Sequence, residues 1–180
     1  MRVIGLDPGL RHTGWGVIEI EANRLRHIAN GTLEPDPNAD MASRLGVLHR
    51  GLCAVLARFA PHEAAVEATL ANRNPSSTLK LGMARGVVLM TPGLSGVPVT
   101  EYMPTVVKKA VVGTGRAGKE QVAMMVGRLL PGCAPDSADA ADALAVAICH
   151  GHSAASLRRW AKASHAAAPD VAAALAGHGR

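Results

Sequence analysis

Aromatic residues and cysteines are scarce in this sequence. Tryptophan, tyrosine and phenylalanine together make up 2% of the 180 residues, so we do not expect a protein that binds nucleic acid by stacking successive bases on a row of rings. The three cysteines, Cys53, Cys133 and Cys149, are odd in number and scattered. This argues against a disulfide framework and favours a reducing compartment.

Long hydrophobic segments are also lacking. No apolar run reaches the length of about 18 residues that a membrane-spanning helix needs. Residues 1–5 pass directly into a strand-like run without the marks of a signal peptide. We therefore expect a cytoplasmic protein with no membrane association. The net charge of +5 is compatible with a nucleic-acid partner, attracted through its phosphates.

The hydrophobic pattern predicts an α/β fold. Three strands joined by short turns, typical of an antiparallel meander, are followed by alternating strand and helix periods. The predicted strands are 2–7, 14–20, 25–33, 64–67 and 97–102, and the predicted helices are 40–59, 76–90, 119–130 and 137–150. This order indicates a mixed five-stranded sheet flanked by helices.

The composition changes near residue 152. Residues 1–152 contain all the predicted elements and suit one domain with one core. Residues 153–180 are rich in alanine, histidine and arginine and have little apolar periodicity, so we expect a largely disordered C-terminal tail.

Four acidic residues stand out by their positions. Asp7 and Glu67 each end a predicted strand, and Asp139 and Asp142 lie on one face of a predicted helix. Their neighbours are small or apolar, where an uncompensated charge is costly. Four converging carboxylates cannot all stay ionised without a cation, and an all-oxygen site suits Mg²⁺ or Mn²⁺. Two such ions can promote hydrolysis of a phosphodiester.

Each acid also has a purely structural interpretation. Asp7 and Glu67 can be turn or capping residues, and Asp139 and Asp142 can simply favour the positive end of their helix dipole. Spacing alone leaves these alternatives open. The run 149–152, Cys-His-Gly-His, matches no usual zinc spacing, so we expect a packed thiol there.

Four motifs, in order along the chain, resemble those of the RuvC family. Residues 5–17, Gly-Leu-Asp-Pro-Gly-Leu-Arg-His-Thr-Gly-Trp-Gly-Val, resemble its opening motif, in which an aspartate precedes Pro-Gly. Val66-Glu67 with 77–86 resembles the second motif and segment 107–122 the third. Residues 139–145, Asp-Ala-Ala-Asp-Ala-Leu-Ala, resemble the fourth. The resemblance covers roughly residues 2–152.

The resemblance implies an RNase H-like fold and a metal-dependent crossover junction endodeoxyribonuclease. Such an enzyme resolves four-way (Holliday) DNA junctions by paired symmetric nicks in homologous recombination and repair. The resemblance also implies a homodimer joined through the helix predicted at 76–90, and RuvA and RuvB as branch-migration partners. Two Mg²⁺ ions per active site, replaceable by Mn²⁺, would be bound by Asp7, Glu67, Asp139 and Asp142.

Basic residues of the family motifs also carry over. Lys108 and Lys119 match positions near the active site and the DNA, where a lysine can stabilise transition-state charge; outside the family context they would be ordinary surface charges. Lys80 and Arg85 match further DNA or dimer-helix positions. Leu70 departs from the family, which often has an aromatic residue there near the junction centre. A leucine can wedge against a base step but cannot stack like a ring.

Three other functions fit parts of the pattern. An actin-like ATPase or sugar kinase also has a strand followed by Asp-x-Gly, but it needs two such lobes and a much longer chain. A non-catalytic module on the same fold would be expected to lack some of the four acids. An RNase H acting on RNA–DNA hybrids would keep the chemistry, and the motifs after Glu67 fit it less well.

Overall fold

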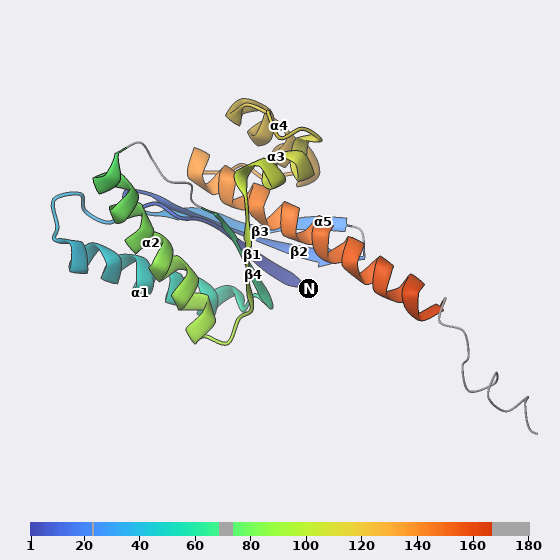
Figure 1. The fold of residues 1–180 in the computed structure, drawn as a ribbon, viewed down its shortest axis with the longest axis horizontal. Helices are drawn as coiled ribbons and strands as arrows, with labels where there is room; N and C mark the ends of the chain where they lie inside the picture. The colour runs from blue at the N-terminus through green and yellow to red at the C-terminus, as the bar shows by residue number, and fades with distance from the viewer. Residues whose placement is uncertain (23, 69–73, 167–180) are drawn as a thin grey trace, which may run out of the picture.

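A five-stranded mixed sheet lies at the centre of the molecule (Figure 1). The computed structural model describes residues 1–22, 24–68 and 74–166, with side chains described up to residue 153. The strands are β1 (Arg2–Asp7), β2 (Thr13–Glu21), β3 (Arg24–Leu33), β4 (Glu63–Glu67) and β5 (Val99–Tyr102). Their order across the sheet is β3-β2-β1-β4-β5. The first three are antiparallel neighbours, and β1, β4 and β5 run parallel. The predicted fold class is confirmed.

Helices cover both faces of this sheet. On one face α1 (Met41–Phe59) packs against α2 (Pro75–Leu94), and on the other lie α3 (Pro104–Val112), α4 (Lys119–Leu129) and α5 (Ala138–Ala166). Alternate residues of β1 serve the two layers: Ile4 and Leu6 pack toward α1, and Val3 packs toward α5. None of the helices in the described ranges has the length and apolarity that a membrane span requires.

Two helices differ from the sequence-based expectation. Helix α3 forms in a segment for which no helix is predicted; Pro104 begins it at a position whose N–H a helix does not use, and Gly113, with φ of 86°, ends it. Helix α5 continues past the predicted domain boundary at residue 152 to Ala166. The rest of the predicted tail, 167–180, lies outside the described residues.

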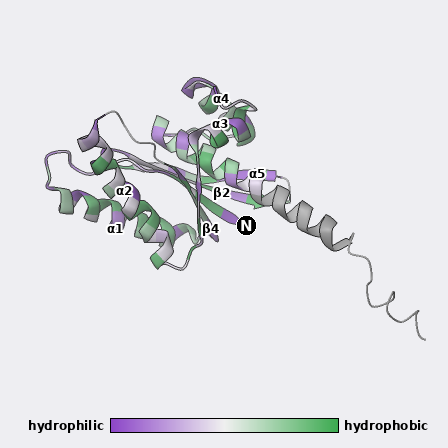
Figure 2. Cartoon of the chain, in the orientation of Figure 1, coloured by the Kyte–Doolittle hydropathy of each residue, from purple (hydrophilic) through white to green (hydrophobic). Residues whose placement is uncertain are grey.

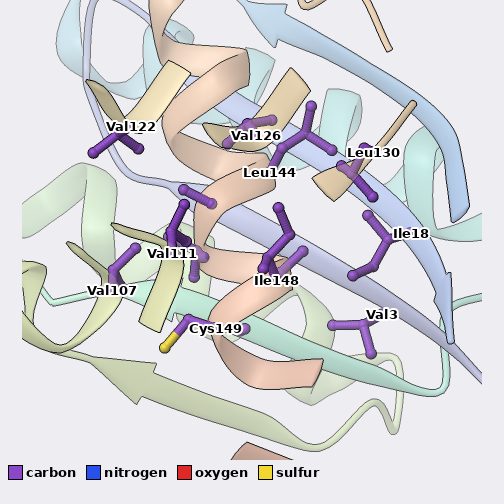
Figure 3. Packing of buried hydrophobic residues seen from close by; sticks show 14 of the residues in the cluster. Val3, Ile18, Val107, Val111, Val122, Val126, Leu130, Leu144, Ile148 and Cys149 are labelled. Carbon is purple, nitrogen blue, oxygen red and sulfur yellow. The ribbon is translucent and has the colours of Figure 1, made fainter. Parts of the chain in front are cut away.

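The buried face of α5 supplies much of the core. Leu144 and Ile148 lie against Val3 and Ile18 of the sheet, and side chains from α3 and α4 close the cluster from the other side (Figure 3). Cys149 is fully buried in this cluster, as expected for a packed thiol. Burying such aliphatic side chains stabilises a fold by about 1.5–3 kcal/mol each, so α5 is held firmly against the sheet.

A buried polar chain fixes the middle of α5. His150 is 5% exposed, and its ring nitrogens hydrogen-bond to the carboxylate of Glu63 in β4 and, at 2.9 Å, to the hydroxyl of Tyr102 in β5. Because a buried polar group is costly unless it is paired, this chain favours one position of α5 along the sheet.

Glycines in β1 and β2 let α5 approach the sheet at backbone distance. A Cβ atom built on Gly5 would overlap the carbonyl oxygen of Ala143, and one on Gly14 would overlap the carbonyl oxygen of Asp139. The helix backbone therefore lies directly on the strand backbone. Gly14 is also the register partner of Asp7, so the start of α5 is held beside the end of β1.

We expect Gly5→Ala to destabilise the protein strongly. The added methyl group meets main-chain atoms of α5, which cannot rotate away, so the loss should be near the upper end of overpacking costs, about 3 kcal/mol. Urea unfolding monitored by circular dichroism measures it. Gly127→Ala in α4 is the matched control: nothing lies within 4 Å of its Cβ position, and alanine should stabilise that helix by up to about 1 kcal/mol. Equal stability of Gly5→Ala and the native protein would contradict the close approach.

Candidate active site

Three of the four predicted acids line one cavity at the end of the sheet. Asp7 and Glu67 enter it from the adjacent ends of β1 and β4, which are parallel neighbours, and Asp142 enters from α5. Lys108 of α3 and Lys119 of α4 complete its polar wall, and its volume is about 290 Å³. The structure thus brings together side chains from five separate elements of the chain.

Asp139 lies one helical turn before Asp142 and lines an adjoining cavity instead. It still acts on the first cavity through its charge, which contributes to the raised pKa of Asp7. In the part of the chain with described side chains, no three histidine, cysteine, aspartate or glutamate residues are arranged as a closed set of ligands around one point. The four acids therefore lie at the same end of the sheet but do not all line the same cavity.

The first turn of α5 is tied to β3, and this sets where its two aspartates lie. Ser137 caps the helix: its Oγ accepts from the N–H of Ala140 at 3.0 Å and hydrogen-bonds to Oγ1 of Thr32 at 2.6 Å. The N–H of Asp136 donates to Oδ1 of Asn30 at 3.2 Å. Nothing in the spacing of the sequence indicates these two contacts with β3, so both were missed.

The loop after Asp7 is also closed by a buried side chain. The hydroxyl of Thr13, which is fully buried, donates to the carbonyl oxygen of Gly9 at 2.6 Å, and the N–H of Gly9 approaches the same hydroxyl at 3.3 Å. The loop carries Arg11 and His12, which line the adjoining cavity together with Asp139. Its position follows from the Gly-x₃-Thr spacing of the opening motif.

Burial and mutual repulsion change the ionisation of the carboxyl groups. Burial, followed by the charges of Glu67, Asp142 and Asp139, raises the pKa of Asp7 to about 8, although Lys119 lowers it in part. Burial and the charge of Asp142 also raise the pKa of Glu67, against smaller lowering effects of a hydrogen bond from Asp7 and of Lys108 and Lys119. Burial and repulsion therefore disfavour the ionised forms of Asp7 and Glu67, and the site lacks positive charge.

The two lysines supply part of that positive charge. Nζ of Lys119 lies 3.4 Å from Oδ2 of Asp142, and this carboxylate is the main cause of the raised pKa of Lys119. The Lys119 side chain is 79% exposed, so the pair adds little stability and the ammonium group stays free to turn toward a ligand. Lys108 lines the same cavity and acts on Glu67 through its charge.

The remaining predicted residues lie in different places. Lys80 lines the adjoining cavity together with Asp139. Arg85 makes a bidentate ion pair with Glu101, with distances from 2.7 to 2.9 Å, and does not line either cavity. Leu70 lies outside the described residues. Their roles at DNA stay predictions.

This sheet order, with acids at the ends of β1 and β4 and at the start of α5, defines an RNase H-like nuclease. Residues 3–150 match the family model described as crossover junction endodeoxyribonuclease RuvC. The chain belongs to this family, whose members are nucleases that are generally metal-dependent.

Individual relatives agree with this assignment. The crossover junction endodeoxyribonuclease RuvC of Paramagnetospirillum magneticum is 62% identical over 163 residues, which cover 91% of this chain and 98% of the relative. The protein of that name from Rhodospirillum rubrum is 60% identical, over 84% and 90% of the two chains. The solved structure of Thermus thermophilus RuvC in complex with Holliday junction substrate is 38% identical, with a TM-score of 0.80 over 86% of this chain and 95% of that one.

The raised pKa of Asp7 predicts a pH-dependent stability of the metal-free protein. The folded state keeps this proton up to about pH 8, whereas the unfolded chain loses it near its ordinary pKa of 3.8. The contribution of Asp7 to the free energy of unfolding is therefore fully present below pH 3.8 and is lost as the pH rises to about 8. Urea unfolding in chelator across this range measures it.

Asp7→Asn, which cannot ionise, should lose less stability over the same range and be the more stable protein at its upper end. The exposed Glu21→Gln is the control and should keep the native pH dependence. Parallel pH profiles for the native protein and Asp7→Asn would show that Asp7 does not hold this proton.

Proposed function

We propose that this protein resolves four-way (Holliday) DNA junctions by paired symmetric nicks during homologous recombination and DNA repair. The observation that carries the proposal is the convergence of Asp7, Glu67 and Asp142 with two lysines at one end of an RNase H-like sheet. A relative of the same family has been solved with a Holliday junction substrate. The nuclease domain would be residues 1–152.

The four acids would bind two Mg²⁺ ions per active site, replaceable by Mn²⁺. The fit rests on the donor set: carboxylate oxygens are the ligands these ions prefer, and burial of Asp7 and Glu67 without enough positive charge raises the pKa of both. A cation beside these carboxyl groups would offset their repulsion and favour their ionised forms. When bound, such ions activate the attacking water and stabilise the charge of the leaving oxygen.

The other side chains of the cavity would position the DNA strand. Lys108 and Lys119 line the cavity together with the acids, so a phosphate that enters it would be attracted by both lysines and its developing negative charge stabilised. Apolar side chains, Val107, Val122 and Ala145, line the same cavity. They limit the access of water and strengthen every electrostatic interaction inside it.

Further contacts follow from the family context. We propose that Leu70 lies near the junction centre, that Lys80 and Arg85 contribute to the DNA or dimer surface, and that RuvA and RuvB deliver the junction by branch migration. The substrate is chromosomal DNA, so the protein would act in the cytoplasm.

A homodimer through α2 fits the exposed apolar face of that helix. Leu79, Met83, Met90 and Leu94 recur at helical spacing and are 63%, 39%, 47% and 75% exposed. Gly82 and Gly86 have open space at their Cβ positions, which would let a second helix approach closely. In Figure 2 the ribbon of α2 lies beside α1 and carries hydrophobic residues among polar ones. In such a dimer the two active sites would be held at a fixed distance and orientation, so that each could cut one of the two exchanging strands of the junction.

We expect the native protein to nick a labelled synthetic four-way junction symmetrically with Mg²⁺, and a linear duplex of the same sequence hardly at all. Asp7→Asn should reduce nicking by more than about 100-fold, because even indirect changes at metal sites cost about 10–100-fold. Glu21→Gln, far from the acids, should nick normally. Strong junction binding without nicks under either metal would indicate a binding module. Cutting of an RNA–DNA hybrid in preference to the junction would contradict the proposed substrate.

We expect Met90→Glu to separate the dimer. A charge buried between two helices lacks a partner and costs several kcal/mol, and about 3 kcal/mol raises the dissociation constant about 100-fold. Light scattering after size-exclusion chromatography measures the mass. Met124→Glu is the matched control, since Met124 is 53% exposed on α4. An unchanged mass for Met90→Glu, or an equal effect of Met124→Glu, would exclude α2 as the interface.

A further inference from the structure

A second, basic cavity adjoins the acidic one. It has a volume of about 490 Å³ and is lined by Arg11 from the loop after β1, Arg44 from α1 and Lys80 from α2. Asp139 also lines it, whereas Asp142, one turn further along α5, lines the acidic cavity. The first turn of α5 therefore separates two hollows of opposite character.

The positive charge of this second cavity is not neutralised by the protein. Arg11 and Lys80 are exposed and have no ion-pair partner among the described residues. His12 faces the acid Glu34 at 3.5 Å, and both of these side chains are at least half exposed. Among the lining residues, the basic side chains of Arg11, Arg44 and Lys80 stand against the single carboxylate of Asp139. Like charges gathered in one hollow repel one another unless an anion is bound.

Arg44 is the least satisfied of these cations. One of its terminal nitrogens donates to the carbonyl oxygen of Leu10 at 3.1 Å, but its Nε is buried without a hydrogen-bond partner in the described part of the chain. Arg44 also has no carboxylate partner there. A half-buried guanidinium in this condition is costly, and an anion in the cavity would offset that cost.

The start of α2 adds to the same potential. Ser77 and Lys80 in its first two turns line the cavity, so the positive end of a 20-residue helix dipole lies in the wall. The N–H groups of Ser76 and Ser77 are already bound by Oδ1 of Asn74, at 2.9 and 3.3 Å. The helix therefore contributes its field, and the arginines and lysine contribute the hydrogen bonds.

We propose that this cavity is a phosphate subsite: it binds one backbone phosphate of the DNA strand that is cut, adjacent to the phosphate held by the acidic cavity. The proposal rests on the proposed function. Arg11 and Lys80 would bind the same phosphate, with Arg44 behind them. Fixing a neighbouring phosphate on the far side of Asp139 would set which bond of the strand lies against Asp7, Glu67 and Asp142. The residues of this subsite thus position the substrate.

The test uses the full-length protein and junctions that each carry one uncharged methylphosphonate near the cut site. Binding is measured in chelator, where no cutting occurs. The native protein should lose affinity at one neighbouring phosphate in particular, and Arg11→Ala and Lys80→Ala should lose nothing further when that phosphate is neutral. Each variant should also lower the slope of log affinity against log salt by about one. The double variant should lower it by no more than either single one.

Two controls accompany these variants. Arg24→Ala, at the opposite end of the sheet and exposed, should leave affinity and salt slope unchanged. Lys119→Ala should cause no further loss of affinity only when the methylphosphonate is at the cut bond itself. Equal weakening at every methylphosphonate position, or additive effects of Arg11→Ala and Lys80→Ala, would overturn a single subsite in favour of diffuse attraction. These outcomes leave junction nicking by the native protein intact, so they are distinguishable from a failure of the proposed function.

Discussion

The close approach of α5 to β1 and β2 is the constraint on which the site depends. Gly5 and Gly14 remove the side chains that would otherwise separate helix from sheet, and Ala143 presents a small residue in return. Main chain then rests on main chain, so the distance from Asp7 to the aspartates of α5 is set by backbone geometry and not by flexible side chains. The cap at Ser137 and the buried His150 fix the same helix at two points along its length. A catalytic arrangement needs this kind of rigid support.

The same closeness creates an electrostatic conflict. Four carboxylates are gathered at one end of the sheet, and the pKa of Asp7 rises to about 8 because burial and its acidic neighbours disfavour its charged form. The fold tolerates this because apolar cores on both faces of the sheet, one around Leu144 and one around Ile4, hold the elements in place. The repulsion between the acids lowers the stability of the fold, and packing in the two apolar cores offsets that loss, as is usual where function requires like charges to be close.

The hydrophobic pattern, with the turn residues between its segments, predicted the five strands, α1, α2, α4 and the start of α5. It failed at α3, where nine residues with two buried valines give too short a pattern. The acids could be singled out as strand ends and one helix face, since parallel neighbours must end at the same edge. The lysines could not: Lys119 lies 23 positions before Asp142 and meets it only through the packing of α4 on α5, so their selection depended on the family motifs. Arg44 and the Thr32–Ser137 contact left no local signal at all.

The two cavities serve two electrostatic requirements that one cavity cannot meet: collecting carboxylates and attracting a DNA strand. A site that collects carboxylates repels a polyanionic strand until cations are bound, so the acidic cavity by itself is a poor place to hold DNA. Arg11, Arg44 and Lys80 line the neighbouring cavity, so a surface that attracts the strand lies next to one that repels it. A strand held there would approach the acids in a fixed register whatever the state of the acidic cavity. Asp139 lines the basic cavity, and its charge also raises the pKa of Asp7 in the acidic cavity. Binding of an anion or a cation in one cavity would therefore change the electrostatic potential in the other through Asp139.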